Sequence, residues 1–95
     1  MEIKALLLGA LRYENAKGKG TRISYVFLDK DGMSNNEKFH GFAELSFYCD
    51  SDVFDKIPVE LFGKAVTISC EEVPYSNNPM KKRTKVTKIN DISLV

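Results

Sequence analysis

The segment Ser51-Asp52-Val53-Phe54-Asp55-Lys56-Ile57-Pro58 interrupts a series of strand patterns and thereby decides how the chain is interpreted. Its polar start and apolar spacing predict one or two turns of helix, because Ser51 or Asp52 can accept hydrogen bonds from the free N–H groups of a first turn. Pro58 disfavours continuation of a helix through the residue before it. A short helix is therefore expected between the strands that precede it and those that follow.

Three strand patterns precede this segment. The clearest is 22–28, where β-branched and aromatic residues alternate with Ile23, Tyr25 and Phe27 on one face. A first strand is expected over 3–13, with Gly9 marking a bulge or bend that lets one strand serve both halves of a small barrel. A short helix is the alternative there, since its leucines are good helix formers. A third strand is expected over 38–49, after a polar loop at 29–36.

Two strand patterns follow the predicted helix. Leu61-Phe62 is expected to plug the core, and Gly63 to turn the chain. The fourth strand is predicted over 64–72, and the fifth over 81–94. In the fifth strand the apolar residues Val86 and Ile89 are three positions apart, which breaks the two-residue alternation of a strand and indicates a bulge or twist. The inward residues expected for the fourth strand are Val66, Ile68 and Cys70.

The resulting order, three strands, a short helix and two strands, predicts an all-β fold in one domain over residues 1–95. Specifically, it favours a five-stranded OB-fold-like barrel, a small and partly open Greek-key architecture. An SH3-like barrel is the structural alternative, and the helix between the third and fourth strands favours the OB-fold. The phenylalanines expected in the core are Phe27, Phe39, Phe47, Phe54 and Phe62.

The bulk composition limits the function. With 14 basic and 13 acidic residues, the net charge is +1, which excludes a strongly basic polyanion binder on bulk charge alone. We expect Cys49 and Cys70 to be reduced and buried in a cytoplasmic protein, with a disulfide as the minor alternative. The N-terminus lacks the pattern of a secretory leader, and no apolar run reaches the length of a membrane span.

Catalytic and metal-binding patterns are not apparent in the sequence. His40 is the single histidine, and no Cys-x-x-Cys spacing occurs, so neither a zinc site nor a catalytic base is expected. Asp50, Asp52 and Asp55 are explained by the favourable position of carboxylates at a helix start. We therefore expect no enzyme activity, metal or cofactor.

The charges are unevenly distributed along the chain. Basic residues concentrate at the first turn, around Gly18-Lys19-Gly20, and after the hairpin tip at Tyr75, whereas acidic residues concentrate between Glu44 and Glu72. Cations interleaved with aromatic rings suit single-stranded nucleic acid, although lysines on hairpins also serve solubility and protection of strand edges. The phosphate-binding candidates are Arg12, Lys17, Lys19, Arg22, Lys81, Lys82, Arg83 and Lys85, and the base-stacking candidates are Tyr25, Tyr48 and Tyr75.

In layout the sequence resembles the small single-stranded-DNA-binding proteins of filamentous phages and related mobile elements. The resemblance rests on the Gly-Lys turn at 18–20, the following aromatic strand, the hairpin tipped by Tyr75 and the basic final strand 85–94. It implies an OB-type homodimer that coats single-stranded DNA cooperatively during replication. In such a protein Lys17, Lys19 and Arg22 would hold the backbone.

The sequence departs from that family in two places. The segment 51–61 is longer and more helical, and the chain ends without the acidic tail of bacterial housekeeping single-strand-binding proteins. RNA remains open as a ligand. The alternative function is a protein-interaction module, such as a phage accessory or structural subunit, in which the acidic side or an open sheet edge docks a partner.

Overall fold

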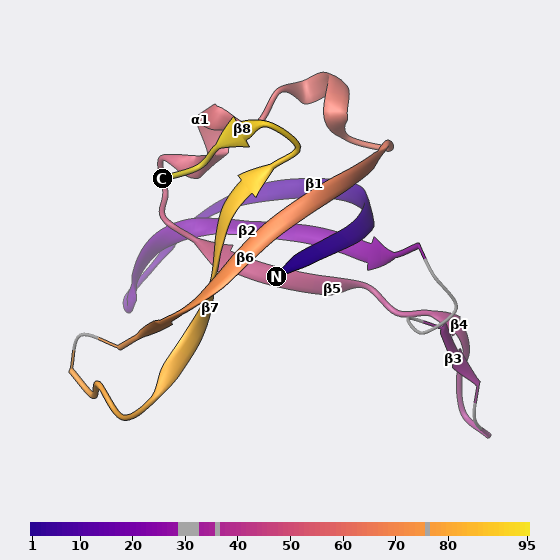
Figure 1. The fold of residues 1–95 in the computed structure, drawn as a ribbon, viewed down its shortest axis with the longest axis horizontal. Coiled ribbons are helices and arrows are strands. Elements are labelled where there is room, and N and C mark those ends of the chain that lie inside the picture. The colour runs from indigo at the N-terminus through magenta and orange to yellow at the C-terminus, as the bar shows by residue number, and fades with distance from the viewer. Residues whose placement is uncertain (29–32, 36, 76) are drawn as a thin grey trace.

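Figure 1 shows the fold of a computed structural model, which describes residues 1–28, 33–35, 37–75 and 77–95. Strands dominate it, and the only helical segments in the described residues are two short ones between β5 and β6. The all-β prediction is therefore confirmed. The elements are β1 (Glu2–Asn15), β2 (Gly18–Phe27), β3 (Met33–Asn35), β4 (His40–Phe42), β5 (Leu45–Cys49), α1 (Val53–Lys56), the 3₁₀ turn η2 (Val59–Leu61), β6 (Ala65–Pro74), β7 (Lys82–Ile89) and β8 (Ile92–Ser93).

The main sheet has six antiparallel strands in the order β5-β2-β1-β6-β7-β8. β1 is long enough to pair with two neighbours, with β6 through residues 2–6 and with β2 through residues 5–15. The register with β2 shifts between Leu7 and Gly9, which confirms the predicted bulge. Figure 1 shows β1 curving from one neighbour to the other, as the sequence predicted.

A second bulge lies in β7, where the sequence has its odd apolar step. Ser69 pairs with Lys88 and Cys70 pairs with Val86, which leaves Thr87 as the extra residue. The Thr87 hydroxyl donates a hydrogen bond to the Ser69 carbonyl oxygen at 3.2 Å. Because the bulge shifts the alternation by one position, Val86 and Ile89 both reach the core.

The sheet is not closed into a barrel, which differs from the prediction of a barrel. β5 and β7 contact each other, but no strand ladder joins them in the described part of the chain. Tyr48 of β5 and Arg83 of β7 line two shared hollows at this junction. Side chains rather than backbone hydrogen bonds therefore occupy the seam.

The core follows the predicted alternation in β6, because Val66, Ile68 and Cys70 are all buried. Leu61 and Phe62 pack against it from the segment after α1, which confirms the predicted plug. The other buried apolar residues are Ala5, Leu7, Ile23, Tyr25, Val53, Ile57, Val86, Ile89 and Leu94.

Two of the five phenylalanines expected in the core are instead exposed, Phe39 at 44% and Phe54 at 38%. Phe54 projects from α1 beneath the guanidinium of Arg12, whose Cζ lies 4.5 Å from the ring centroid. Phe39 precedes β4, which lies outside the main sheet. Phe27, Phe47 and Phe62 pack against the core as expected.

The predicted third strand, 38–49, is divided into β4 and β5. β4 pairs with β3 in a separate hairpin that projects from the main sheet (Figure 1). Gly41, in β4, has a φ of 119°, a left-handed region that side chains other than glycine rarely adopt. The predicted loop at 29–36 thus contains β3, and its residues 29–32 and 36 lie outside the described residues.

The predicted helix at 51–57 is present as α1, although no side chain caps its start. Asp52, at the N-cap, instead pairs with the Lys56 Nζ at 3.2 Å. Cys49 and Cys70 are free thiols, the first half-buried and the second buried. None of the helical segments in the described residues is long and apolar enough to cross a membrane.

Candidate nucleic-acid interface

The outer face of β1, β2 and β5 carries a row of exposed side chains. Leu11 of β1 pairs with Arg22 of β2, which pairs in turn with Tyr48 of β5. Leu11 is 57% exposed and Tyr48 is 62% exposed. Since successive residues point to opposite faces of a strand, Ile23 and Phe47 pack on the inner face while this row faces solvent.

Tyr13 lies one row nearer the β1–β2 turn. It is paired with Gly20, and a β-carbon added at Gly20 would lie only 2.6 Å from the Tyr13 hydroxyl oxygen. The phenol therefore occupies the space above the glycine. The Tyr13 and Tyr48 rings meet edge to face, with centroids 6.2 Å apart and planes at 80°.

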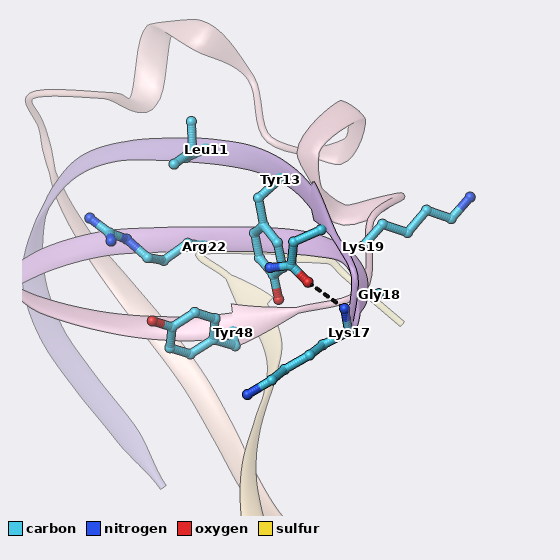
Figure 2. A pocket seen from close by; sticks show the side chains of 8 residues that line it. Leu11, Tyr13, Lys17, Gly18, Lys19, Arg22 and Tyr48 are labelled. Carbon is cyan, nitrogen blue, oxygen red and sulfur yellow. Dashed lines mark hydrogen bonds between the residues drawn. The ribbon is translucent and has the colours of Figure 1, made fainter.

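The β1–β2 turn places two lysines at one end of this face. The Lys17 N–H donates to the Asn15 side-chain oxygen at 2.9 Å, and Gly18 has a φ of 139° that suits glycine. Figure 2 shows Tyr13, Arg22 and Tyr48 with Lys17 near the turn, while the Lys19 side chain reaches away from them. The resulting hollow has a volume of about 590 Å³ and is lined by Leu11, Tyr13, Asn15, Lys17, Gly18, Lys19, Arg22 and Tyr48.

All charged residues that line this hollow are basic. A shallow positive surface next to exposed rings offers cations for phosphates and apolar faces for bases. An anionic, partly aromatic ligand is therefore the class that the hollow suits.

A second hollow, of about 360 Å³, is also lined by Tyr48. It brings the β6–β7 hairpin to the same ring, because Tyr75 and Arg83 line it together with Tyr48. The loop at the tip of the hairpin is closed by the Tyr75 N–H, which donates to the Lys81 carbonyl oxygen at 3.0 Å. Tyr48 thus connects the two basic hairpins that the sequence singled out. The full lining is Ser46, Phe47, Tyr48, Tyr75, Arg83 and Thr84.

Two predicted site residues lie elsewhere. Tyr25 is only 6% exposed and stacks on Phe47 at 4.8 Å between centroids, so its ring is not accessible to a base, and burial raises its pKa. The choice of Tyr25 as a stacking residue was therefore wrong. Arg12 forms an ion pair of 2.6 Å with Asp55 of α1, away from both hollows.

The other predicted cations are placed around the second hairpin without lining the two hollows. Lys81 and Lys82 are exposed, and Lys82 pairs with Pro74 across the hairpin. Lys85 pairs with Glu71 and lines a small cavity of about 20 Å³ at the β5–β7 seam. Lys81 and Lys82 therefore add positive charge next to the tip of the hairpin, and Lys85 adds it at the seam that Tyr48 also lines.

Tyr13 and Leu11 line the first hollow and are not among the predicted site residues. For Tyr13, the sequence does contain a pattern that indicates its position. Once the turn is placed at residues 16–17, antiparallel pairing puts position 13 opposite Gly20, and an aromatic residue commonly packs over a cross-strand glycine. The side chain of Leu11 shares that face because it lies two residues earlier.

Two of the three acidic residues of the cluster at α1, Asp52 and Asp55, are engaged in ion pairs. Asp52 binds Lys56 and Asp55 binds Arg12, in agreement with a structural role for this acidic cluster. Among the described residues, no group of three or more histidines, cysteines, aspartates or glutamates is arranged to hold a metal ion.

Comparison of this chain with protein-family models, with curated proteins and with solved structures found no match.

Proposed function

We propose that this protein binds single-stranded nucleic acid, with DNA as the principal ligand, and does so without sequence preference. One observation carries the proposal. Tyr48 is 62% exposed and lines both hollows, the first together with Tyr13 and Arg22 and the second together with Tyr75 and Arg83.

The chemistry of this surface supports a single strand over a duplex. Stacking on a tyrosine requires a base whose face is free, and each such stack contributes about 1–3 kcal/mol in single-strand binding proteins. Lys17 and Arg22 lie within the same hollow as Tyr13 and Tyr48, so phosphates could be neutralised while bases stack. Every base has an aromatic face, which is why this mode tolerates any sequence.

We further propose that the fold is an OB-fold with an inserted β3–β4 hairpin. The order β5-β2-β1-β6-β7, with α1 between β5 and β6, supports it, since the two ends of that order contact each other. OB-folds bind oligonucleotides on the face of their second and third strands and through two hairpin loops. β2, β5, the turn at 16–17 and the β6–β7 hairpin occupy the equivalent places here.

A role in phage or mobile-element replication, in the cytoplasm, is part of the same proposal. It is supported by the layout of the sequence, with a Gly-Lys turn first and an aromatic-tipped hairpin later.

The test is fluorescence-polarisation titration of labelled oligo-dT and of a labelled duplex over a series of salt concentrations. The proposal predicts binding to oligo-dT that weakens steeply with salt, because counterions are released from each neutralised phosphate, and weaker binding to the duplex. Absence of oligo-dT binding at low salt would refute the proposal. Equal binding of both DNAs would refute base stacking on Tyr48.

The second candidate function is protein interaction through the β3–β4 hairpin, with a second copy of this chain as the partner. Met33, Phe39 and Phe42 are each exposed by 44–48%. A two-stranded hairpin that stands alone is marginally stable in water, and contact with a partner would stabilise it. Sedimentation over a range of concentrations tests this, because a dimer should dissociate in Phe42→Ser. A wild-type monomer at high concentration would exclude the candidate.

A further inference from the structure

Arg22 is the one cation lining the first hollow that forms an ion pair within the described part of the chain. Its Nη2 lies 3.2 Å from the Glu44 Oε1. The two side chains are 40% and 50% exposed. The Arg22 Nε is buried and has no hydrogen-bond partner in the described residues. The guanidinium is thus held at one end only.

The ion pair determines where the guanidinium lies. Arg22 is opposite Tyr48 in the ladder, whereas Glu44 immediately precedes β5, four residues before Tyr48. At about 3.4 Å per residue, this distance is roughly 14 Å along the strand. Figure 2 shows the Arg22 side chain extending away from Tyr13 and the β1–β2 turn. Glu44 therefore holds the guanidinium at the far end of the hollow from Lys17.

We infer that Glu44 competes with nucleic-acid phosphate for Arg22, so that binding of a strand replaces the Glu44 carboxylate by a phosphate. This inference rests on the proposed function and adds a regulatory residue to the same site. A carboxylate and a phosphate present similar oxygen pairs to the N–H donors of a guanidinium. In the free protein Glu44 occupies the Nη2 donor of Arg22, which a phosphate of the strand would use instead.

The exchange is energetically feasible because the ion pair is half-exposed. Solvent-exposed ion pairs contribute little to stability, since water screens the charges and both side chains lose rotamer freedom. Once a base of the strand is stacked on Tyr48, the neighbouring phosphate is held close to Arg22. Its effective concentration there is high, so it competes well with the Glu44 carboxylate. An isolated anion has no such advantage, so Glu44 favours strands over free phosphate.

The test is a double-mutant cycle measured by fluorescence polarisation with oligo-dT at fixed low salt. Glu44→Gln is expected to tighten binding about two- to five-fold, the value of an exposed ion pair. In an Arg22→Met background, which keeps the aliphatic packing of the side chain, the same change is expected to have no effect. Asp55→Asn is the matched control, because it also removes one carboxylate from an arginine ion pair, Arg12–Asp55, away from the hollows.

The outcomes separate this inference from the proposed function. Wild-type binding to oligo-dT with no gain in Glu44→Gln would overturn competition and leave the proposed function standing. Weaker binding of Glu44→Gln would overturn it as well, because Glu44 would then position Arg22 for phosphate. An equal gain in Asp55→Asn would show a general charge effect and overturn it. Failure of the wild type to bind oligo-dT would refute both proposals.

Discussion

The ring of Tyr13 covers Gly20 on the neighbouring strand. A β-carbon at position 20 would lie 2.6 Å from the Tyr13 hydroxyl oxygen and 2.9 Å from the carbonyl oxygen of Cys49. Neither approach is tolerated without movement, and the Cys49 oxygen belongs to the backbone. This contact positions the aromatic side of the first hollow, because Tyr13 in turn meets Tyr48 edge to face.

Gly20→Ala is therefore expected to destabilise the protein by about 1–3 kcal/mol, the usual cost of overpacking, and to weaken oligo-dT binding by displacing Tyr13. Gly9→Ala is the matched control, because a β-carbon there meets nothing within 4 Å. Urea unfolding and polarisation titration of both variants measure these effects. Equal stability of the two variants would contradict the close contact at Gly20.

Tyr48→Ala is expected to weaken oligo-dT binding by about 5- to 150-fold, which corresponds to the 1–3 kcal/mol of one base stack. Because the side chain is largely exposed, the free energy of unfolding should change by no more than about 0.5 kcal/mol. Tyr48→Phe keeps the ring and should bind like the wild type. If Tyr48→Phe bound as weakly as Tyr48→Ala, the hydroxyl rather than stacking would be responsible.

Tyr25→Ala, in contrast to Tyr48→Ala, is expected to lower the stability of the fold rather than to remove a contact with a base. Its ring stacks on Phe47 and meets Phe27 edge to face in the core, so its removal should cost about 3–5 kcal/mol, as for other buried aromatic residues. Thermal and urea unfolding measure this loss. A small change in stability with a large loss of binding would return Tyr25 to the interface.

Arg83→Ala and Arg12→Ala are expected to separate the cations that meet the strand from those that do not. Arg83 lines the hollow beside Tyr48 and Tyr75, so its loss should reduce the slope of log K against log salt by about 0.7. Arg12 is paired with Asp55, and its loss should leave that slope unchanged. Titrations at several salt concentrations decide this, and equal slopes for both variants would place Arg83 outside the interface.

The stability of the fold is expected to fall at alkaline pH because of Cys49. Burial, with a smaller contribution from Asp50, raises the pKa of this thiol from 9.0 to about 11. The neutral thiol is thus favoured in the folded state, so its contribution is present below about pH 9 and is lost as the pH rises through about 11. Urea unfolding at pH 8 and pH 10.5 should show a smaller decrease for Cys49→Ala than for the wild type. An identical decrease in stability of the variant and the wild type would exclude Cys49 as the cause of the alkaline loss.

Much of the fold was predictable because it depends on local patterns. Alternation placed Val66, Ile68 and Cys70 inward, and breaks in alternation located the bulges at Gly9 and between Val86 and Ile89. These features follow from the two-residue period of a strand, which is written directly in the sequence. The helix at α1 was predictable from its flanking polar residues and Pro58.

The β3–β4 hairpin was not predictable in the same way. Phe39 and Phe42 carry the composition of a strand, but both are substantially exposed, and within the described residues β4 pairs with β3 rather than with a strand of the main sheet. Composition reports that a segment favours strand and does not report which face, if any, the rest of the protein covers.

The sequence by itself determined the long strands of the main sheet, their bulges, the short helix and the concentration of cations in two hairpins. Only the tertiary structure decided which aromatic rings and cations share one surface. Local alternation already placed Tyr25 on the face of Ile23 and Phe27, where it is buried, whereas Tyr48 joins the exposed row because β5 pairs with β2 in the register that sets it opposite Arg22. Arg12 is paired with Asp55, 43 residues later, and lines neither hollow. Such assignments depend on contacts between distant residues, which no local pattern encodes.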